Sequence, residues 1–425
     1  MSGQIKLMVV VFLFSGAMYK GFSQKSDSLS NIKDFKSYPF IIQDSPSRLF
    51  TMRQIDQDYL SGYRLLTPFL GKYLSPAVLY ISEAAGFVLF WGPLSHEEAH
   101  RSILVSENIG AVSQPFFLSQ RGGYVDGVTD AQLKQLRDND FPVFARMHTA
   151  GLESDYNLIS REEELLAFEE EPYKNIAVEY LLRKAMLMQY FLIGLFHYDI
   201  DGPEETDELK RDIVGNDVYG IVRHWHRPSM DYKRYTLYNE LTVEEKTFIK
   251  RMGFRSFLNL LNVNALGFRN FPVFSGLKMN IGIGYTLSPF GDFIDETAWL
   301  KYRNDYKISM YLREYQNRNT WFAGGGIGIH NLRVIPHFET SLNLHYWNQP
   351  QHLDFNETKG QTGGAIEMVT GYRIYSKKPG SFSYISLDLG VILKTEGFLP
   401  GEIVMDRHSG FRFGISFGLD KTGFR

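Results

Sequence analysis

The residues of this chain best suited to chemistry are His96, Glu97 and His100, within the segment His-Glu-Glu-Ala-His. Residues four apart share one face of an α-helix, so the two histidines can present their imidazoles to one metal ion. Glu97 follows the first histidine, where its carboxylate can take a proton from a metal-bound water molecule. The spacing predicts a catalytic metal site with Glu97 as general base. The alternative is an ordinary amphipathic helix whose His and Glu side chains face solvent.

A catalytic zinc ion takes three protein ligands and keeps one position for water. Glu153, further along the chain in a helical stretch, can reach the two histidines if the two helices pack antiparallel. His148 is the competing third ligand and would make an all-histidine site. His224 and His226 flank Trp225 and could stabilise the oxyanion of the transition state, or could serve a surface or interface role.

The segment from Trp91 to Tyr156 resembles the zincin metallopeptidases, with every defined position of the HExxH motif present. It is most similar to the gluzincins, and among them to membrane-associated zinc peptidases, in which a glutamate on a following helix completes the site. In those enzymes an aspartate four residues after the glutamate supports the first histidine. Here Asp155 follows Glu153 by two residues and Asn157 stands at the fourth position. The resemblance implies Zn²⁺ held by the two motif histidines and Glu153, and hydrolysis of peptide bonds in a protein or lipoprotein of the cell envelope.

The first residues have the pattern of an export signal. Lys6 precedes an apolar run from Leu7 to Tyr19, and small residues stand at a plausible cleavage site near Ser23, which predicts a signal peptide over 1–23. The apolar run is shorter than the roughly 20 residues of a membrane span, although an uncleaved anchor is the alternative. The chain has no cysteine, hence no disulfide and no site for a lipid on cysteine. The net charge of −3 argues against nucleic-acid binding.

The rest of the chain divides into two halves with different periodicity, which predicts the α+β class. Residues 24–271 have helical patterning and form the metallopeptidase-like domain. Residues 272–425 alternate apolar and polar side chains in about eight strands of about ten residues, separated by Gly, Pro or polar turns. These strands run near 277–287, 297–302, 306–315, 321–329, 338–346, 366–375, 385–393 and 411–419.

Such strands in an exported chain are typical of an outer-membrane β-barrel, whereas a soluble barrel or sandwich would show the same alternation. Glycine and isolated charges on the polar face, with aromatic residues near strand ends, favour the membrane barrel. We therefore expect an outer-membrane protein in contact with lipid, with its helical domain in the periplasm. The alternative is a non-enzymatic barrel whose helical domain binds a partner.

Three further expectations concern the helical half. The apolar segment from Pro76 to Trp91 predicts a buried or membrane-facing helix beside the metal site. The charged run from Arg161 to Glu171 predicts a solvated helix face. The segment from His224 to Lys233 predicts a loop.

Overall fold

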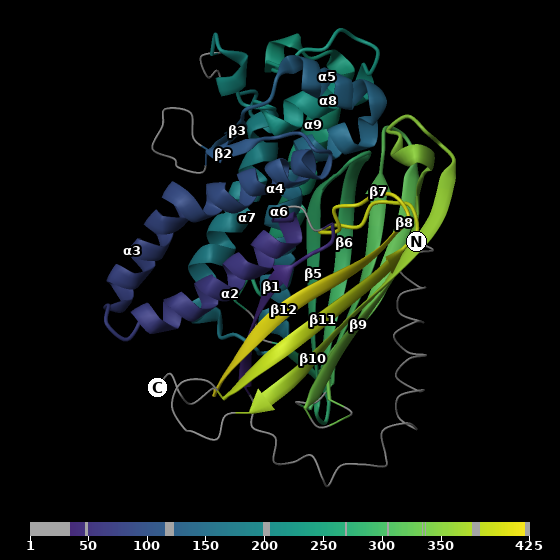
Figure 1. Cartoon of the computed structure of the whole chain (residues 1–425). Helices are drawn as coiled ribbons and strands as arrows, with labels where there is room; N and C mark the ends of the chain where they lie inside the picture. The colour runs from purple at the N-terminus through teal and green to yellow at the C-terminus, as the bar shows by residue number, and fades with distance from the viewer. Residues whose placement is uncertain are drawn as a thin grey trace.

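The structure, a computed structural model, describes residues 35–46, 50–114, 123–198, 205–267, 270–303, 306–333, 335, 337–375 and 383–420. The predicted signal peptide, 1–23, lies outside the described residues. Helices precede a large antiparallel sheet (Figure 1), which confirms the mixed α+β class and the order of its two parts.

The sheet contains all eight predicted strands, and each pairs antiparallel with its neighbours in the chain. They are β5 (Leu277–Ser288), β6 (Gly291–Tyr302), β7 (Tyr306–Gln316), β8 (Trp321–Leu332), β9 (Phe338–Pro350), β10 (Gly360–Tyr375), β11 (Tyr384–Lys394) and β12 (His408–Asp420). Two more strands, β1 (Phe35–Gln43) and β4 (Phe271–Phe274), extend it to ten in the order β1-β12-β11-β10-β9-β8-β7-β6-β5-β4.

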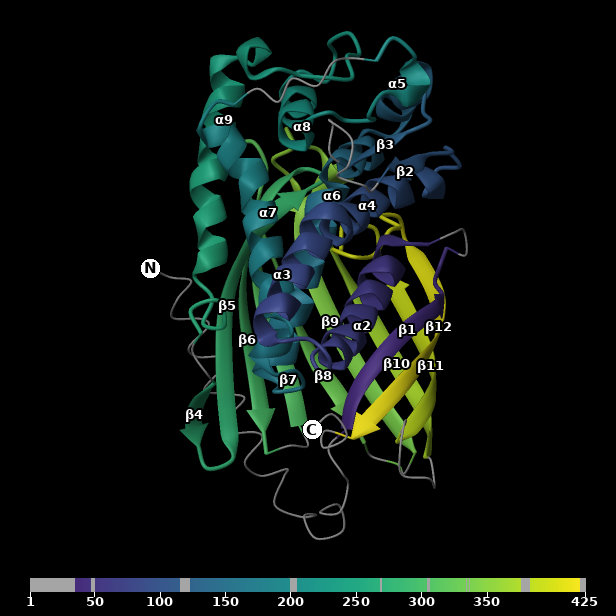
Figure 2. The same cartoon turned by 90° about the vertical axis from the view of Figure 1, so that its left-hand side faces the viewer.

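The prediction of a barrel was wrong in two respects. The N-terminal strand β1 lies in the sheet although its sequence was assigned to the helical half. Among the described residues β1 and β4 are the outermost strands and do not pair with each other, so the sheet is open. The physical reason is that helices occupy the open side and contact the strands there (Figures 1 and 2), which keeps the two edges apart.

The helical part consists of α2 (Met52–Leu70), α3 (Pro76–Gly86), α4 (Gly92–Ser106), α5 (Asp130–Asn139), α6 (Phe141–Ala167), α7 (Ala177–Leu195), α8 (Asp217–His226) and α9 (Val243–Ser256). A short ribbon of β2 (Val112–Gln114) and β3 (Tyr124–Asp126) lies between α4 and α5. Threonine caps begin several helices; the Thr242 hydroxyl, for example, accepts from the Glu245 backbone in a capping box. His224 and His226 lie in the last turn of α8, so the predicted loop begins later than expected.

The charged run of α6 is not a solvated face, contrary to the prediction. Glu162, Glu163 and Glu171 are buried, and Glu171 forms ion pairs with Lys36 of β1 at 2.7 Å and with Arg64 of α2 at 3.1 Å. The reason is that α6 packs against β5 and β6, and α2 against β1. Glu163 is balanced by Lys184 at 2.8 Å and Glu171, just beyond α6, by Lys36 and Arg64, whereas burial raises the pKa of Glu162 well above its usual value.

The two faces of the sheet differ in the sense opposite to that of a soluble protein. Along β9 to β12 the inner face carries many charged and polar side chains, whereas the outer face exposes large apolar ones. Elsewhere the inner face also contributes apolar side chains, such as Tyr285, Leu287 and Phe293, to the buried core. The exposed apolar residues of β9 to β12 are Phe338, Leu344, Tyr346, Ile366, Met368, Tyr372, Ile374, Tyr375, Ile385, Leu387, Leu389, Leu393, Phe411 and Phe413. Close backbone packing explains the glycines of β8, since a Cβ on Gly326 would lie 2.7 Å from the Leu344 carbonyl oxygen.

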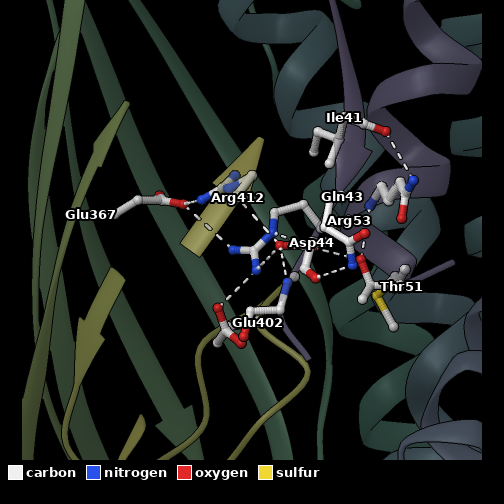
Figure 3. Close-up of polar contacts among 12 residues, drawn as sticks. Ile41, Gln43, Asp44, Thr51, Arg53, Glu367, Glu402 and Arg412 are labelled. Atoms are coloured by element: carbon white, nitrogen blue, oxygen red, sulfur yellow. Dashed lines mark hydrogen bonds and ion pairs between the residues drawn. The ribbon is translucent and has the colours of Figure 1, made fainter. Parts of the chain in front are cut away.

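An ionic network fixes the beginning of α2 to the inner face of the sheet (Figure 3). Arg53 contacts Asp44 at 3.1 Å, Glu402 at 2.9 Å and Glu367 at 3.5 Å. Arg412 of β12 pairs with the same Glu367 of β10. The network therefore ties the end of β1 and the beginning of α2 to β10 and β12, which are far away in sequence, and to the loop that follows β11.

Candidate metal site

The two motif histidines lie on α4 and are buried, as a metal site requires. Asp217, the first residue of α8, completes a group in which one ligand-type atom of each residue lies within 4.8 Å of the others. The Oδ2 atom of Asp217 is 3.1 Å from Nε2 of His96 and 3.4 Å from Nε2 of His100. Two imidazoles and one carboxylate are a donor set suited to zinc.

The other nitrogen of each imidazole has a fixed acceptor. Nδ1 of His96 donates to Oδ2 of Asp155 at 2.8 Å, and Nδ1 of His100 donates to the Met147 carbonyl oxygen at 2.6 Å. Arg183 donates to Oδ1 of Asp155 at 2.6 Å and holds that carboxylate in place. When the imidazoles are neutral, a proton on each Nδ1 would leave each Nε2 with a lone pair available to a metal ion. The residues present therefore fit a metal ion.

Gly151 explains how α6 comes so close to the site. A Cβ at this position would lie 2.3 Å from Nε2 of His96 and 2.5 Å from Nε2 of His100. Only glycine leaves that space free. Asp155 lies four residues later on the same face of α6, and this places its carboxylate against His96.

Glu153, predicted as the third ligand, is not brought to the imidazoles. It follows Gly151 by two residues, a rotation of about 200° around the helix, so its side chain leaves α6 on the other side. There Oε1 accepts from Arg146 at 2.7 Å and from the Gly401 backbone at 2.8 Å. Glu153 thus anchors the loop after β11. Asp217 lies beside the two imidazoles, where the sequence had led us to expect Glu153.

The remaining predicted histidines do not join the group. His148 is buried beside Phe144 and His224, with ring centroids 4.9 and 5.8 Å away, and burial lowers its pKa to about 3. Burial likewise holds the pKa of His224 well below its usual value. His226 points elsewhere, with its ring 4.8 Å from that of Phe355. His224 and His226 are two residues apart on α8, so they cannot act on one oxyanion.

The Glu97 carboxyl group is buried and has a pKa near neutrality. Burial raises the pKa of its carboxyl group to about 7, although the neighbouring imidazoles act to lower it. A Cβ on Gly123 would lie 3.1 Å from Oε1 of Glu97, so glycine leaves that side of the carboxylate open. A base that both takes up and releases protons near pH 7 suits general acid–base catalysis.

Opposite charges on His96, His100 and Asp217 favour their close approach. Burial opposes protonation of His96, but the carboxylates of Asp155 and Asp217 raise its pKa well above the usual value. Burial would raise the pKa of Asp217, but His100 and His96 hold it below its usual range. A bound divalent cation would supply the positive charge that stabilises the Asp217 carboxylate, a charge that the imidazoles would otherwise provide.

Replacing Asp155 with asparagine is expected to weaken zinc binding about 10- to 100-fold, because His96 would lose the acceptor that fixes its tautomer and orientation. Zinc affinity is measured by competition with a chromophoric chelator, and folding by thermal melting. Asp138→Asn, which changes an exposed carboxylate on α5, is the matched control. Wild-type affinity in a folded Asp155→Asn variant would show that Asp155 does not position the ligand.

Comparison with known proteins gives no relative for this chain: no protein-family model, no curated protein and no solved structure matches it.

Proposed function

We propose that this chain is a zinc-dependent metallopeptidase of the bacterial cell envelope, held in the outer membrane by its sheet. The observation that carries the proposal is the convergence of His96, His100 and Asp217, with both Nδ1 atoms held by acceptors. Buried groups that converge in this way are more typical of a metal centre than of a core packed for stability.

The roles of the chain's residues follow from their positions. Zinc, when bound, lowers the pKa of a bound water molecule and polarises the substrate carbonyl group. Glu97, next to the first ligand, takes the proton from the attacking water and delivers it to the leaving amine. Asp155 and the Met147 carbonyl group keep the imidazoles oriented. The substrate is a peptide bond in a protein or lipoprotein of the envelope.

Membrane location is supported by the polarity of the sheet. A soluble protein buries the apolar face of its strands, whereas here the apolar face of β9 to β12 is exposed and the polar face is turned inward. An apolar outer band around a polar interior is the pattern of outer-membrane sheets. The proposal places the end of the molecule that carries α5 and α8 on the periplasmic side.

Metal analysis of the purified wild type beside His100→Ala tests the enzyme proposal. We expect about one zinc per wild-type chain after loading and dialysis, and loss of that zinc in the variant. His226→Ala, on the far side of α8, is the control and should keep the metal. A folded wild type that takes up no zinc would refute the metallopeptidase and leave a non-enzymatic outer-membrane protein with a partner-binding helical part.

A further inference from the structure

The free edge of β1 is covered by side chains of α2. Alternate residues of this edge strand turn their backbone groups away from β12, and side chains on one face of α2 donate to the carbonyl oxygens. The pairs are Arg64 with Ser37 at 3.2 Å, Ser61 with Pro39 at 2.5 Å, Gln57 with Pro39 at 3.2 Å and Gln54 with Ile41 at 2.9 Å. These are the groups through which an edge strand pairs with another strand.

Helix and strand match in length along this contact. The four donors recur at helical spacing from Gln54 to Arg64, about 15 Å along the axis, and the acceptors span about 13 Å of extended strand. The Ile41 N–H donates to Asp58 at 2.7 Å, and Pro39 has no N–H to satisfy. In a bilayer an open sheet edge is tolerated only where protein satisfies its backbone groups. On the outward edge of β1, the carbonyl oxygens of Ser37, Pro39 and Ile41 and the N–H of Ile41 meet that requirement through side chains of α2.

The next helix turns apolar side chains away from the protein. α3 has no buried residue, and Val78, Tyr80 and Ile81 are exposed, Ile81 at 69%. The continuous helical segment Pro76–Ser106 is the one stretch of the described chain that is long and apolar enough to cross a membrane. Its second half, α4, packs against α6, so the outward-facing part is α3 with the π-helical turn Phe87–Trp91.

The apolar surface continues around the molecule. α2 lies beside β1 and α3 follows on the other side of α2 (Figure 2), and the outer face of the strands next to β1 is apolar too. Further exposed apolar residues near the opposite edge are Phe254, Phe257, Leu260, Leu261, Leu266, Phe271, Val273 and Phe274. Exposed apolar residues on several sides of one molecule are typical of a surface that is covered by a partner or by lipid.

We propose that lipid acyl chains cover the face made by α2 and α3, so that these helices complete the membrane-embedded wall that β1 and β4 leave open. The inference rests on the proposed membrane location but goes beyond it. A membrane sheet of this kind is ordinarily sealed by strand pairing, and here the seal is a helical hairpin. Lipid fits because the outward side chains of α3 are aliphatic or aromatic apart from Ser82, and Glu83 is the one charged residue of that helix.

Single-cysteine labelling can test the inference, because the natural chain has no cysteine. Nitroxides would be placed at Ile81→Cys on α3, at Leu387→Cys on the outer face of β11, and at Val243→Cys at the start of α9, all exposed positions. In phosphatidylethanolamine–phosphatidylglycerol vesicles, collision rates with oxygen and with a water-soluble nickel chelate are compared. We expect the oxygen-to-nickel ratio at Ile81 and Leu387 to exceed that at Val243 at least about threefold, since the hydrocarbon core excludes water.

The outcomes separate the inference from the proposed function. A lipid-exposed Leu387 beside a water-exposed Ile81 would overturn the helical wall and leave the membrane location intact. Water exposure at both Ile81 and Leu387 would overturn both the helical wall and the proposed membrane location. A label at Ile81 that collides with neither reagent would mean that protein, such as a second copy of the chain, covers this face, and the inference would fail.

Discussion

Replacing Glu97 with glutamine is expected to reduce peptide hydrolysis about 10²- to 10⁴-fold, while zinc stays bound at wild-type occupancy. Glutamine has nearly the same shape but cannot accept the proton of the attacking water. The ligands are untouched, because Glu97 is assigned to proton transfer and not to coordination. Zinc content and the rate of cleavage of fluorescein-labelled casein are measured on the same preparations.

Glu98→Gln is the matched control, since Glu98 is adjacent in sequence but pairs with Arg101 on another face of α4. The wild-type rate should also fall as the pH drops below neutrality, because burial raises the pKa of Glu97 to about 7 and only its carboxylate form accepts a proton. Loss of zinc in Glu97→Gln, or full activity with zinc present, would show that the roles are wrongly assigned.

Replacing Asp217 with alanine is expected to weaken zinc binding by more than about 100-fold, the upper range for loss of a residue that only supports a ligand. The expectation follows from geometry, since its carboxylate lies 3.1 and 3.4 Å from the two ligand nitrogens. Two imidazoles alone do not hold a catalytic zinc tightly. Zinc affinity is measured by competition with a chromophoric chelator.

Glu153→Gln and His148→Ala provide the comparison, since each changes a residue that the sequence had offered as third ligand. Both variants should keep wild-type zinc affinity when folded, although Glu153→Gln weakens the contacts to Arg146 and Gly401. Glu153→Gln with much weaker zinc binding, beside an unaffected Asp217→Ala, would restore the glutamate-type site and reject the one seen here.

Sequence reasoning located the long strands because their side chains alternate over about six to eleven residues, a local property that each strand carries by itself. It missed β1, whose sequence Phe-Lys-Ser-Tyr-Pro-Phe-Ile-Ile-Gln alternates poorly and contains a proline. Closure of the sheet is not a local property either. It depends on which edges meet, and the covering of β1 by Gln54, Ser61 and Arg64 becomes visible only when the two segments are side by side.

The residues of the candidate site likewise divide into those that the local sequence reveals and those that only the folded chain brings together. His96, Glu97 and His100 are close in sequence, so their spacing is enough to place them on one helix. Asp217 comes from a helix far along the chain, and its sequence reveals only a helix start, with Asn216 as cap. Gly151 was a usable sign, since a glycine inside a long helix favours close approach of another element. It would have directed attention to the face of α6 that carries Asp155, and away from Glu153.

Pairing of β1 with β12 has a consequence for the order of folding. Phe35 is opposite Asp420, so the first described strand finds its partner only at the far end of the chain. Contacts between segments so distant in sequence form slowly, because the entropy of closing the loop must be lost before the contact contributes. Until the last described strand has been synthesised, β1 has no neighbour in the sheet. A chain that stops short of His408 would therefore lack β12 and leave β1 without a partner, so this end of the sheet is completed only after the rest of the sheet has been synthesised.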